Sequence, residues 1–277
     1  MTGTEYLESV HAMVQKLLSS GLNVILDLHD YMRFAAGQKA GDGDVVTTDD
    51  MQKIWTLLAD KFNDLATQYP NQYTHPNQLI FGIMNEPHDM QTQQVVDNDN
   101  AGIAAIRNQG LSNLILVEGN GWSGLHSWND SAVGTDSKSN ASLMNEIIDQ
   151  DNNYTIDVHQ YFDSNGSGTH PECQPLTNFQ TYLHWADFKA WVNKYKVKVF
   201  LSEFGSPSNG SNCASDANYL LSQIAGLQYT DSTGGFIGWT TWFTSHSWTG
   251  LLSMQPASDP TQMHNIYAKQ LTAIAAK

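Results

Sequence analysis

The chain of 277 residues is poor in basic side chains. It contains 13 Lys and Arg against 28 Asp and Glu, which gives a formal net charge of −15. A negative field of this kind repels polyanions, so the composition argues against nucleic acid or an anionic membrane surface as a partner. It suits an uncharged substrate. No stretch is apolar over the length that a bilayer requires, and we therefore expect no transmembrane helix.

Long linkers and low-complexity runs are also missing. The pattern is continuous from end to end, which predicts a single domain over residues 1–277. The apolar fraction of 40% is enough for a sizeable core. Eight tryptophans and eleven tyrosines are more than packing alone usually requires. Exposed rings of this kind often stack on the flat face of a ligand.

Cysteine is scarce, since only Cys173 and Cys213 are present, and they form either one disulfide or two idle thiols. The N-terminal segment has no basic region before its apolar positions, so it is not a signal peptide. The two cysteines and the acidic balance favour a secreted protein whose signal is absent from this chain. Five N-x-S/T triplets point the same way, namely Asn129, Asn140, Asn153, Asn165 and Asn209.

Short apolar runs alternate with amphipathic segments along the chain. Helical spacing of apolar residues is found over residues 7–18, 51–69, 101–109, 143–149, 182–195, 216–228 and 263–277. Between these segments lie six apolar strand candidates, at residues 22–31, 79–87, 113–122, 154–163, 197–205 and 234–243. Near-continuous apolar strands separated by helices are typical of a parallel sheet that is covered on both faces. The fold is then either a doubly wound sheet or a (β/α)8 barrel.

The ends of the strands favour the barrel. Almost every strand candidate runs into polar or aromatic groups, which are His29, Asn85 with Glu86, Glu118, His159 with Tyr161, Glu203, and Trp239 with Trp242. A doubly wound sheet concentrates its site at one switch point, whereas a barrel places site residues on many strand ends at one face. We predict a (β/α)8 TIM barrel of about six βα units, two short of a complete ring.

Two glutamates, Glu86 and Glu203, each stand where an apolar strand runs out. A carboxylate in this position often pairs with a cation or caps a helix, but cations are scarce in this chain. Glycoside hydrolysis requires two facing carboxyl groups, one that donates a proton and one that attacks or activates water. Pro87 cannot donate a ladder hydrogen bond, so it ends the strand next to Glu86. The pair therefore indicates a glycosidase.

Four strings carry a more specific pattern: VILDLHDYMR, FGIMNEPHD, IDVHQYFDSNGSGTHPEC and LSEFG. They resemble the strand-end motifs of glycoside hydrolase family 5, and most closely the endo-β-1,4-glucanases (cellulases) of its subfamily 5. The resemblance covers nearly the whole chain from Tyr6 on. The Asn-Glu-Pro motif is shared across a wider clan of retaining enzymes, whereas the string over residues 157–173 is much more specific.

The resemblance implies a role for each strand-end residue. Glu86 is the general acid/base and Glu203 the nucleophile of a double displacement with retention. Asn85 binds the sugar 2-hydroxyl, and His29 contacts the glucosyl unit in the cleaved subsite. His159 lies near the acid/base, and Tyr161 donates a hydrogen bond that keeps the nucleophile ionised. The substrate implied is a β-1,4-glucan polysaccharide or oligosaccharide.

Aromatic and cysteine residues also acquire roles from the resemblance. Trp242 forms the stacking floor of the cleaved subsite, and Trp122 and Trp248 are either candidates for neighbouring subsites or structural loop aromatics. Trp239 falls inside the strand candidate and is therefore expected in the core. Cys173 and Cys213 bond to each other, which closes a long loop and contributes roughly 3–4 kcal/mol. For His88 and His170 a structural role is the simpler interpretation. No His pair has convincing helical spacing, and retaining glycosidases need no metal, so neither a metal nor a cofactor is expected.

The chain departs from the family at its start. The family barrel opens with a strand, a helix and a second strand before the helix that begins this sequence, and its strand-borne Arg has no counterpart here. Either the chain is a truncated form of an enzyme, or another component such as a partner chain fills the gap. Open barrel edges favour self-association. The alternatives in function are another β-glycanase of the clan (mannanase or xyloglucanase) and a non-catalytic glycan-binding fragment.

Overall fold

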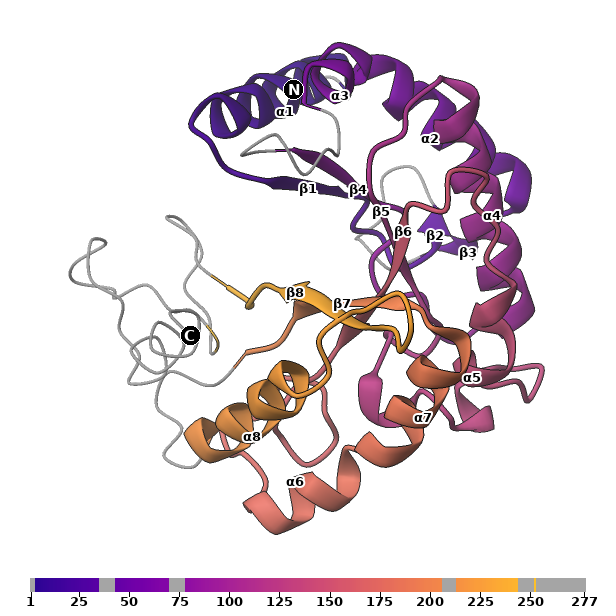
Figure 1. Cartoon of the computed structure of the whole chain (residues 1–277). Coiled ribbons are helices and arrows are strands. Elements are labelled where there is room, and N and C mark those ends of the chain that lie inside the picture. The colour runs from indigo at the N-terminus through magenta and orange to yellow at the C-terminus, as the bar shows by residue number, and fades with distance from the viewer. Residues whose placement is uncertain (1–2, 35–42, 70–77, 206–212, 244–251, 253–277) are drawn as a thin grey trace. The chain divides into compact units, whose positions relative to one another are not determined.

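The computed structural model describes residues 3–34, 43–69, 78–205, 213–243 and 252 (Figure 1). The chain divides into two compact units. The first unit is formed by residues 1–122 and 130–156, and the second by residues 123–129 and 157–277. The expected last helix over 263–277, as well as Trp248 and Asn209, lies outside the described residues.

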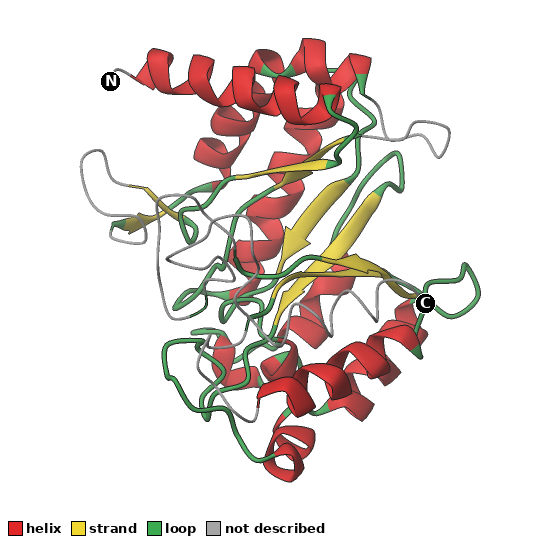
Figure 2. Cartoon of the chain, turned by 90° about the vertical axis from the view of Figure 1, so that its left-hand side faces the viewer, coloured by secondary structure: helices red, strands yellow, loops and turns green. Residues whose placement is uncertain are grey.

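The first unit contains helices outside three parallel strands. Strand β1 (Val24–Asp27) pairs with β4 (Leu79–Gly82), and β4 pairs with β5 (Ile115–Glu118). The helices α1 (Gly3–Ser19), α2 (Thr48–Lys61), α3 (Asn63–Gln68) and α4 (Thr92–Asn108) form a layer outside these strands (Figures 1 and 2). The shorter elements are β2 (Arg33–Phe34), β3 (Asp44–Val45), η2 (Ser131–Val133), α5 (Asn140–Leu143) and η3 (Met144–Glu146).

Capping and close packing fix the outer helices to the strands. Thr47 and Asp50 form a reciprocal capping box at the start of α2. Trp55 of α2 is fully buried, and its ring nitrogen donates a hydrogen bond of 2.9 Å to the carbonyl of Ile83. A Cβ on Gly102 of α4 would lie 3.0 Å from the Trp55 ring, so a glycine lets the two helices approach closely.

The predicted helix over 143–149 is wrong in its extent. Helix α5 ends at Leu143, and after the short η3 the chain is extended at Ile147. Asp149 instead accepts two hydrogen bonds, of 2.8 and 2.9 Å, from the buried Arg107 of α4. Burial alone would raise the pKa of Asp149, but the hydrogen bonds from Arg107 and Asn153 outweigh it and lower that pKa. This ion pair holds residues 147–153 against the start of β5.

The second unit is built on β7 (Lys198–Glu203) and β8 (Gly235–Trp239), which are parallel, and on the end of β6 (Tyr154–His159). Its helices are η1 (Leu125–Ser127), α6 (Leu176–Tyr182), α7 (Trp185–Tyr195) and α8 (Cys213–Ala225). Both α7 and α8 contact β8. The helix predicted over 182–195 begins only at Trp185, because His184 has a left-handed backbone (φ +47°) that separates α7 from α6.

All six predicted strands are present, and they follow the order β1-β4-β5-β6-β7-β8. Strand β6 passes from the first unit into the second. The predicted helix over 51–69 is divided at Phe62 into α2 and α3, and the helix predicted over 101–109 begins earlier, at Thr92. The short β2–β3 pair was not expected. Among the described residues no helix has the length and apolar character needed to span a bilayer.

Candidate active site

In the first unit, the loop after β4 carries Asn85 and Glu86. The strand itself ends at Gly82, so both side chains project from a buried loop rather than from the strand. The backbone N–H of Asn85 donates to the carbonyl of Leu28, 2.9 Å away, and this bond ties the loop to the segment after β1. The structure thus places Asn85 and Glu86 on a rigid support next to His29.

His29 lies between Asn85 and Asp27. The Asn85 amide nitrogen is 3.3 Å from His29 Nε2, and His29 Nδ1 is 3.0 Å from Asp27 Oδ2. Because an amide nitrogen only donates, Nε2 accepts, and the proton on Nδ1 is donated to Asp27. Asp27 therefore orients His29, which in turn orients Asn85.

Glu86 has a left-handed backbone, with φ of +48°. Its N–H donates a hydrogen bond of 2.8 Å to Oε2 of Glu118, the last residue of β5, which is buried. The sequence showed Glu118 only as one of several strand-end residues. The sequence signal for Glu118 is its position: it is a carboxylate at the end of β5, and β5 pairs with β4, the strand that precedes Glu86.

Three aromatic side chains lie beside this loop. Trp122 is 48% exposed, and its ring stacks on His88 with centroids 4.5 Å apart and planes 12° apart. Tyr31 lies edge-on to His88, with centroids 5.8 Å apart. The backbone N–H of Trp122 donates to the carbonyl of Pro87, 3.0 Å away. The interpretation of His88 as a lone structural side chain is therefore incomplete, because it supports an exposed tryptophan.

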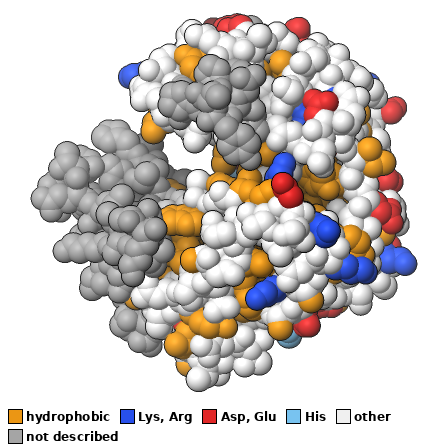
Figure 3. Space-filling model, viewed as in Figure 1, with side chains coloured by type: hydrophobic (Ala, Val, Ile, Leu, Met, Phe, Trp, Pro, Cys, Tyr) orange, Lys and Arg blue, Asp and Glu red, His pale blue; other side chains and the backbone are white. Residues whose placement is uncertain are grey.

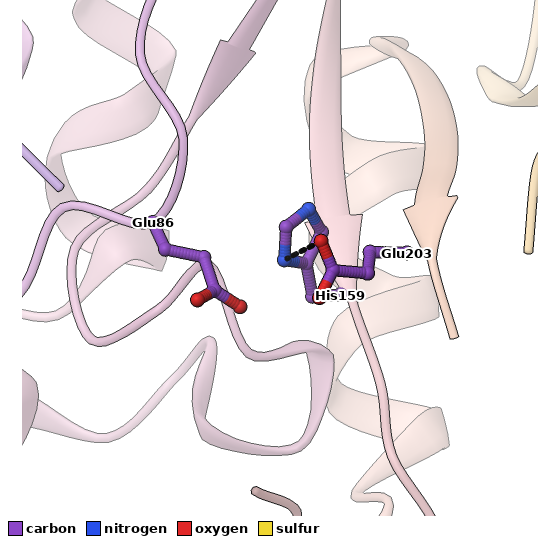
Figure 4. Close-up of side chains that lie close together, drawn as sticks. All are labelled: Glu86, His159 and Glu203. Carbon is purple, nitrogen blue, oxygen red and sulfur yellow. Dashed lines mark ion pairs between the residues drawn. The ribbon is translucent and has the colours of Figure 1, made fainter. Parts of the chain in front are cut away.

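In the second unit, Glu203 is the last residue of β7, and its carboxylate lies next to the side chains of Tyr161 and His159. The Tyr161 hydroxyl donates a hydrogen bond to Glu203 Oε1. His159 Nδ1 lies 3.9 Å from Glu203 Oε2, and its Nε2 is 2.8 Å from the Ser202 hydroxyl. Figure 4 draws the His159–Glu203 pair as a dashed line and also shows Glu86 of the first unit. The Glu203 side chain is only 13% exposed, so these contacts operate in a largely dehydrated environment.

A loop held by Asp163 packs against Tyr161. The buried Asp163 carboxylate accepts hydrogen bonds from the Gly168 N–H (2.9 Å), the Ser167 hydroxyl (2.9 Å) and His170 Nδ1 (2.9 Å). A Cβ on Gly168, where φ is +70°, would lie 2.7 Å from the Tyr161 ring. The loop thus rests on the ring whose hydroxyl contacts Glu203. His170 pairs with Asp163, as expected of a structural histidine.

We predict that Asp163→Asn loosens this loop and lowers the midpoint of thermal unfolding by several degrees at neutral pH. Burial alone raises the pKa of Asp163, but the hydrogen bonds from Gly168, His170 and Ser167 outweigh it and lower that pKa. A lowered pKa contributes stability that is present above the unfolded value of about 4 and is lost as the pH falls through the folded value. Thermal melts at pH 7 and pH 3 check this, and the difference between parent and variant should shrink in acid. An equal difference at both pH values would contradict it.

The disulfide prediction is confirmed. Cys173 and Cys213 are bonded, with Cα atoms 5.3 Å apart and a sequence separation of 40. The bond fastens the loop after β6 to the start of α8.

Trp242 follows β8 and lies close to the segment after β7. Its N–H donates to the carbonyl of Phe204, 2.7 Å away, and a Cβ on Gly205 would lie 2.4 Å from its carbonyl oxygen. Trp242 is half-buried. Trp239 is also only half-buried and packs edge-on to Phe204, with centroids 5.7 Å apart, so the expectation of a core residue is wrong. It stands at the end of β8, where the strand leaves the interior.

The family model for cellulase (glycosyl hydrolase family 5) matches residues 1–247. The chain belongs to this family. It is 35% identical to Endoglucanase 1 of Robillarda sp. (strain Y-20) over 263 residues, which cover 87% of this chain and 61% of that protein. It is 29% identical to endo-beta-1,4-glucanase B of Aspergillus niger, over 92% of this chain and 68% of that protein. The chain thus spans about three fifths of the length of the first of these relatives.

Solved structures show the same relationship. A crystal structure of an endo-beta-1,4-glucanase from Xanthomonas axonopodis pv. citri is 30% identical, with a TM-score of 0.79 over 98% of this chain and 78% of that chain. The structure of XacCel5A in complex with cellopentaose is 28% identical, with a TM-score of 0.78 over 99% of this chain and 79% of that chain. This similarity confirms the predicted fold class, a (β/α)8 barrel, of which the described residues contain six strands.

Proposed function

We propose that the protein is an endo-β-1,4-glucanase that cleaves internal β-1,4-glucosidic bonds with retention. The observation that carries the proposal is the match of the family 5 model over residues 1–247, together with relatives named as endoglucanases. The cellopentaose complex of a structural neighbour supports a β-1,4-glucan chain as the substrate. The composition agrees with an uncharged substrate, because charged residues make up only 15% of the chain. On the face in Figure 3 most of the coloured charged side chains lie toward the right-hand side.

Glu203 is the proposed nucleophile. The Tyr161 hydroxyl donates to one of its oxygens, and such a bond favours the ionised carboxylate that nucleophilic attack requires. The Asp163 loop fixes the Tyr161 ring from the side of Gly168, so the hydroxyl is held in place. His159 lies next to the second oxygen of Glu203 and is itself bound to Ser202.

Glu86 is the proposed acid/base. It protonates the glycosidic oxygen as Glu203 attacks the anomeric carbon, so that the bond to the leaving glucan breaks and a glycosyl-enzyme forms. Glu86 then removes a proton from water, which attacks the same carbon and releases Glu203. Asn85, oriented by His29, binds the sugar 2-hydroxyl. Retention requires carboxyl groups about 5–5.5 Å apart.

Aromatic side chains bind the remaining sugar units in this proposal. Trp242 forms the floor of the cleaved subsite, and Trp122 and Trp248 serve neighbouring subsites. A ring face matches the C–H face of a glucose unit. The disulfide is typical of proteins in oxidising compartments and supports an extracellular site of action on polysaccharide.

Product analysis tests the proposal. The chain is incubated with soluble carboxymethyl cellulose, mannan and xyloglucan, with Glu203→Gln as the control, and reducing ends and oligosaccharides are measured. We expect hydrolysis of the β-1,4-glucan, with a rapid fall in viscosity that marks internal cleavage. Faster hydrolysis of mannan or xyloglucan would contradict the substrate assignment, and binding of the glucan without cleavage would mark a glycan-binding fragment.

A further inference from the structure

We propose that Glu118 is a positioning residue that sets the acid/base Glu86 through the Glu86 backbone amide. The inference rests on the proposed function and extends it to a residue on the neighbouring strand. The observation behind it is the hydrogen bond of 2.8 Å from the Glu86 N–H to Glu118 Oε2, at a residue whose φ is +48°.

The backbone of Glu86 adopts a conformation that is rare for a residue other than glycine. Such a conformation persists when neighbouring groups hold it in place. A bond from an N–H to a carboxylate is about twice as strong as one to a neutral acceptor. The hydrogen bond to Glu118 thus holds the backbone of Glu86, whose side chain must reach the glycosidic oxygen.

The end of β5 that carries Glu118 is itself rigid. Asn140 bonds both backbone groups of Asn120, accepting from its N–H and donating to its carbonyl, each at 2.8 Å. A Cβ on Gly119 would lie 2.7 Å from the Asn140 side chain, so the chain passes close against it. Glu118 therefore projects from a support that has little freedom to move.

The same segment contacts the loop after Glu86 at two further points. The Asn120 amide nitrogen donates to the carbonyl of Met90 at 2.7 Å. The Trp122 N–H donates to the carbonyl of Pro87. The segment from Glu118 to Trp122 is thus hydrogen-bonded to the loop from Glu86 to Met90 at Glu86, Pro87 and Met90.

The carboxyl group of Asp99 is close enough to Glu118 to be affected by its charge. Asp99 of α4 is 1% exposed, and neither of its carboxyl oxygens has a hydrogen-bond partner among the described residues. Burial, and next the negative charge of Glu118, raise the pKa of Asp99 well above its usual range. A raised pKa favours the neutral form of Asp99.

A positioning role has a signature that a purely structural role lacks. The sugar alcohol that departs from a natural glucan is a poor leaving group and needs the proton of Glu86. In contrast, 2,4-dinitrophenolate departs without protonation. Displacing Glu86 should therefore slow cleavage of a cellooligosaccharide far more than formation of the glycosyl-enzyme from a dinitrophenyl cellobioside. General loss of folded protein would lower both rates equally.

The experiment compares the parent chain with Glu118→Ala and Glu118→Gln, and with Val117→Ala as a matched control. Val117 is fully buried on the same strand. The Glu86 N–H donates to the Glu118 carboxylate, so the change at Val117 leaves this acceptor in place. For Glu118→Ala we expect kcat on cellopentaose to fall about 10²-fold, and release of dinitrophenolate in the first turnover to fall less than about tenfold. Glu118→Gln keeps an acceptor oxygen and should show a smaller loss with the same pattern.

Hydrogen exchange of the Glu86 amide, measured by NMR, gives a readout that needs no activity. In Glu118→Ala this amide should exchange at least about tenfold faster, while Asp99→Asn and Val117→Ala leave its rate relative to neighbouring amides unchanged. Unchanged exchange in Glu118→Ala, or equal loss on both substrates, would overturn the inference. If the parent cleaves neither substrate, the proposed function fails, and the exchange rates still decide whether Glu118 holds the Glu86 backbone.

Discussion

Glu203→Gln is expected to reduce hydrolysis of soluble β-glucan by about 10⁴-fold or more, which is the scale of loss when a catalytic nucleophile is removed. The amide oxygen of glutamine is nearly neutral and does not displace the leaving glucan, so no glycosyl-enzyme forms. The replacement has almost the same shape and still accepts a hydrogen bond from Tyr161. Initial rates of reducing-end release check the prediction, with thermal melts to show that the variant is folded.

Glu172→Gln is the matched control in the second unit. Glu172 is exposed, so the same chemical change there should leave the rate unaltered. Activity of Glu203→Gln within tenfold of the parent would show that Glu203 is not the nucleophile. In the same assay, Tyr161→Phe should give an intermediate loss, because it removes the donor and leaves the carboxylate.

Glu86→Ala is expected to lower kcat on cellooligosaccharides by about 10²–10⁴-fold, which is the usual contribution of general acid–base catalysis. The loss should depend on the leaving group. With a dinitrophenyl cellobioside the first step needs no proton, so the glycosyl-enzyme forms and then accumulates because no base activates water. A burst of dinitrophenolate followed by slow turnover is the expected time course.

Azide provides the diagnostic for this variant. It needs no general base, so it attacks the anomeric carbon of the glycosyl-enzyme, breaks the bond to Glu203 and gives a β-cellobiosyl azide. Added azide should raise turnover of Glu86→Ala and leave the parent unaffected, and the azide product is identified by mass spectrometry and NMR. Glu146→Gln, an exposed change in the first unit, serves as the control. Absence of both the burst and the azide product would exclude Glu86 as the acid/base.

The strands were the most predictable part of the fold. Apolar runs such as residues 79–82 and 115–117 are buried on both faces, and this burial leaves a pattern that the sequence shows directly. The ends of the elements were less predictable. Strand β4 stops at Gly82 and helix α5 at Leu143. In the segments that follow, Asn85 and Asp149 form hydrogen bonds with partners far away in sequence. A local pattern does not contain those partners.

The candidate catalytic residues could be predicted from the sequence, but the contacts that hold them in position could not. The spacing of His159 and Tyr161 placed both near a strand end, whereas the Asp163 loop that rests on Tyr161 depends on the positive φ of Gly168. Likewise, the bond between Glu118 and the Glu86 N–H depends on how two adjacent strands end. The single domain over residues 1–277 and self-association through open edges stay predictions.

The most direct test of a retaining mechanism through Glu203 is to trap the glycosyl-enzyme. The chain is treated with 2,4-dinitrophenyl 2-deoxy-2-fluoro-β-cellobioside, digested with protease and sequenced by mass spectrometry. The account predicts one cellobiosyl adduct, on Glu203, and time-dependent loss of activity that Glu203→Gln does not show. An adduct on another residue, or hydrolysis that yields the α-anomer with no adduct, would contradict it.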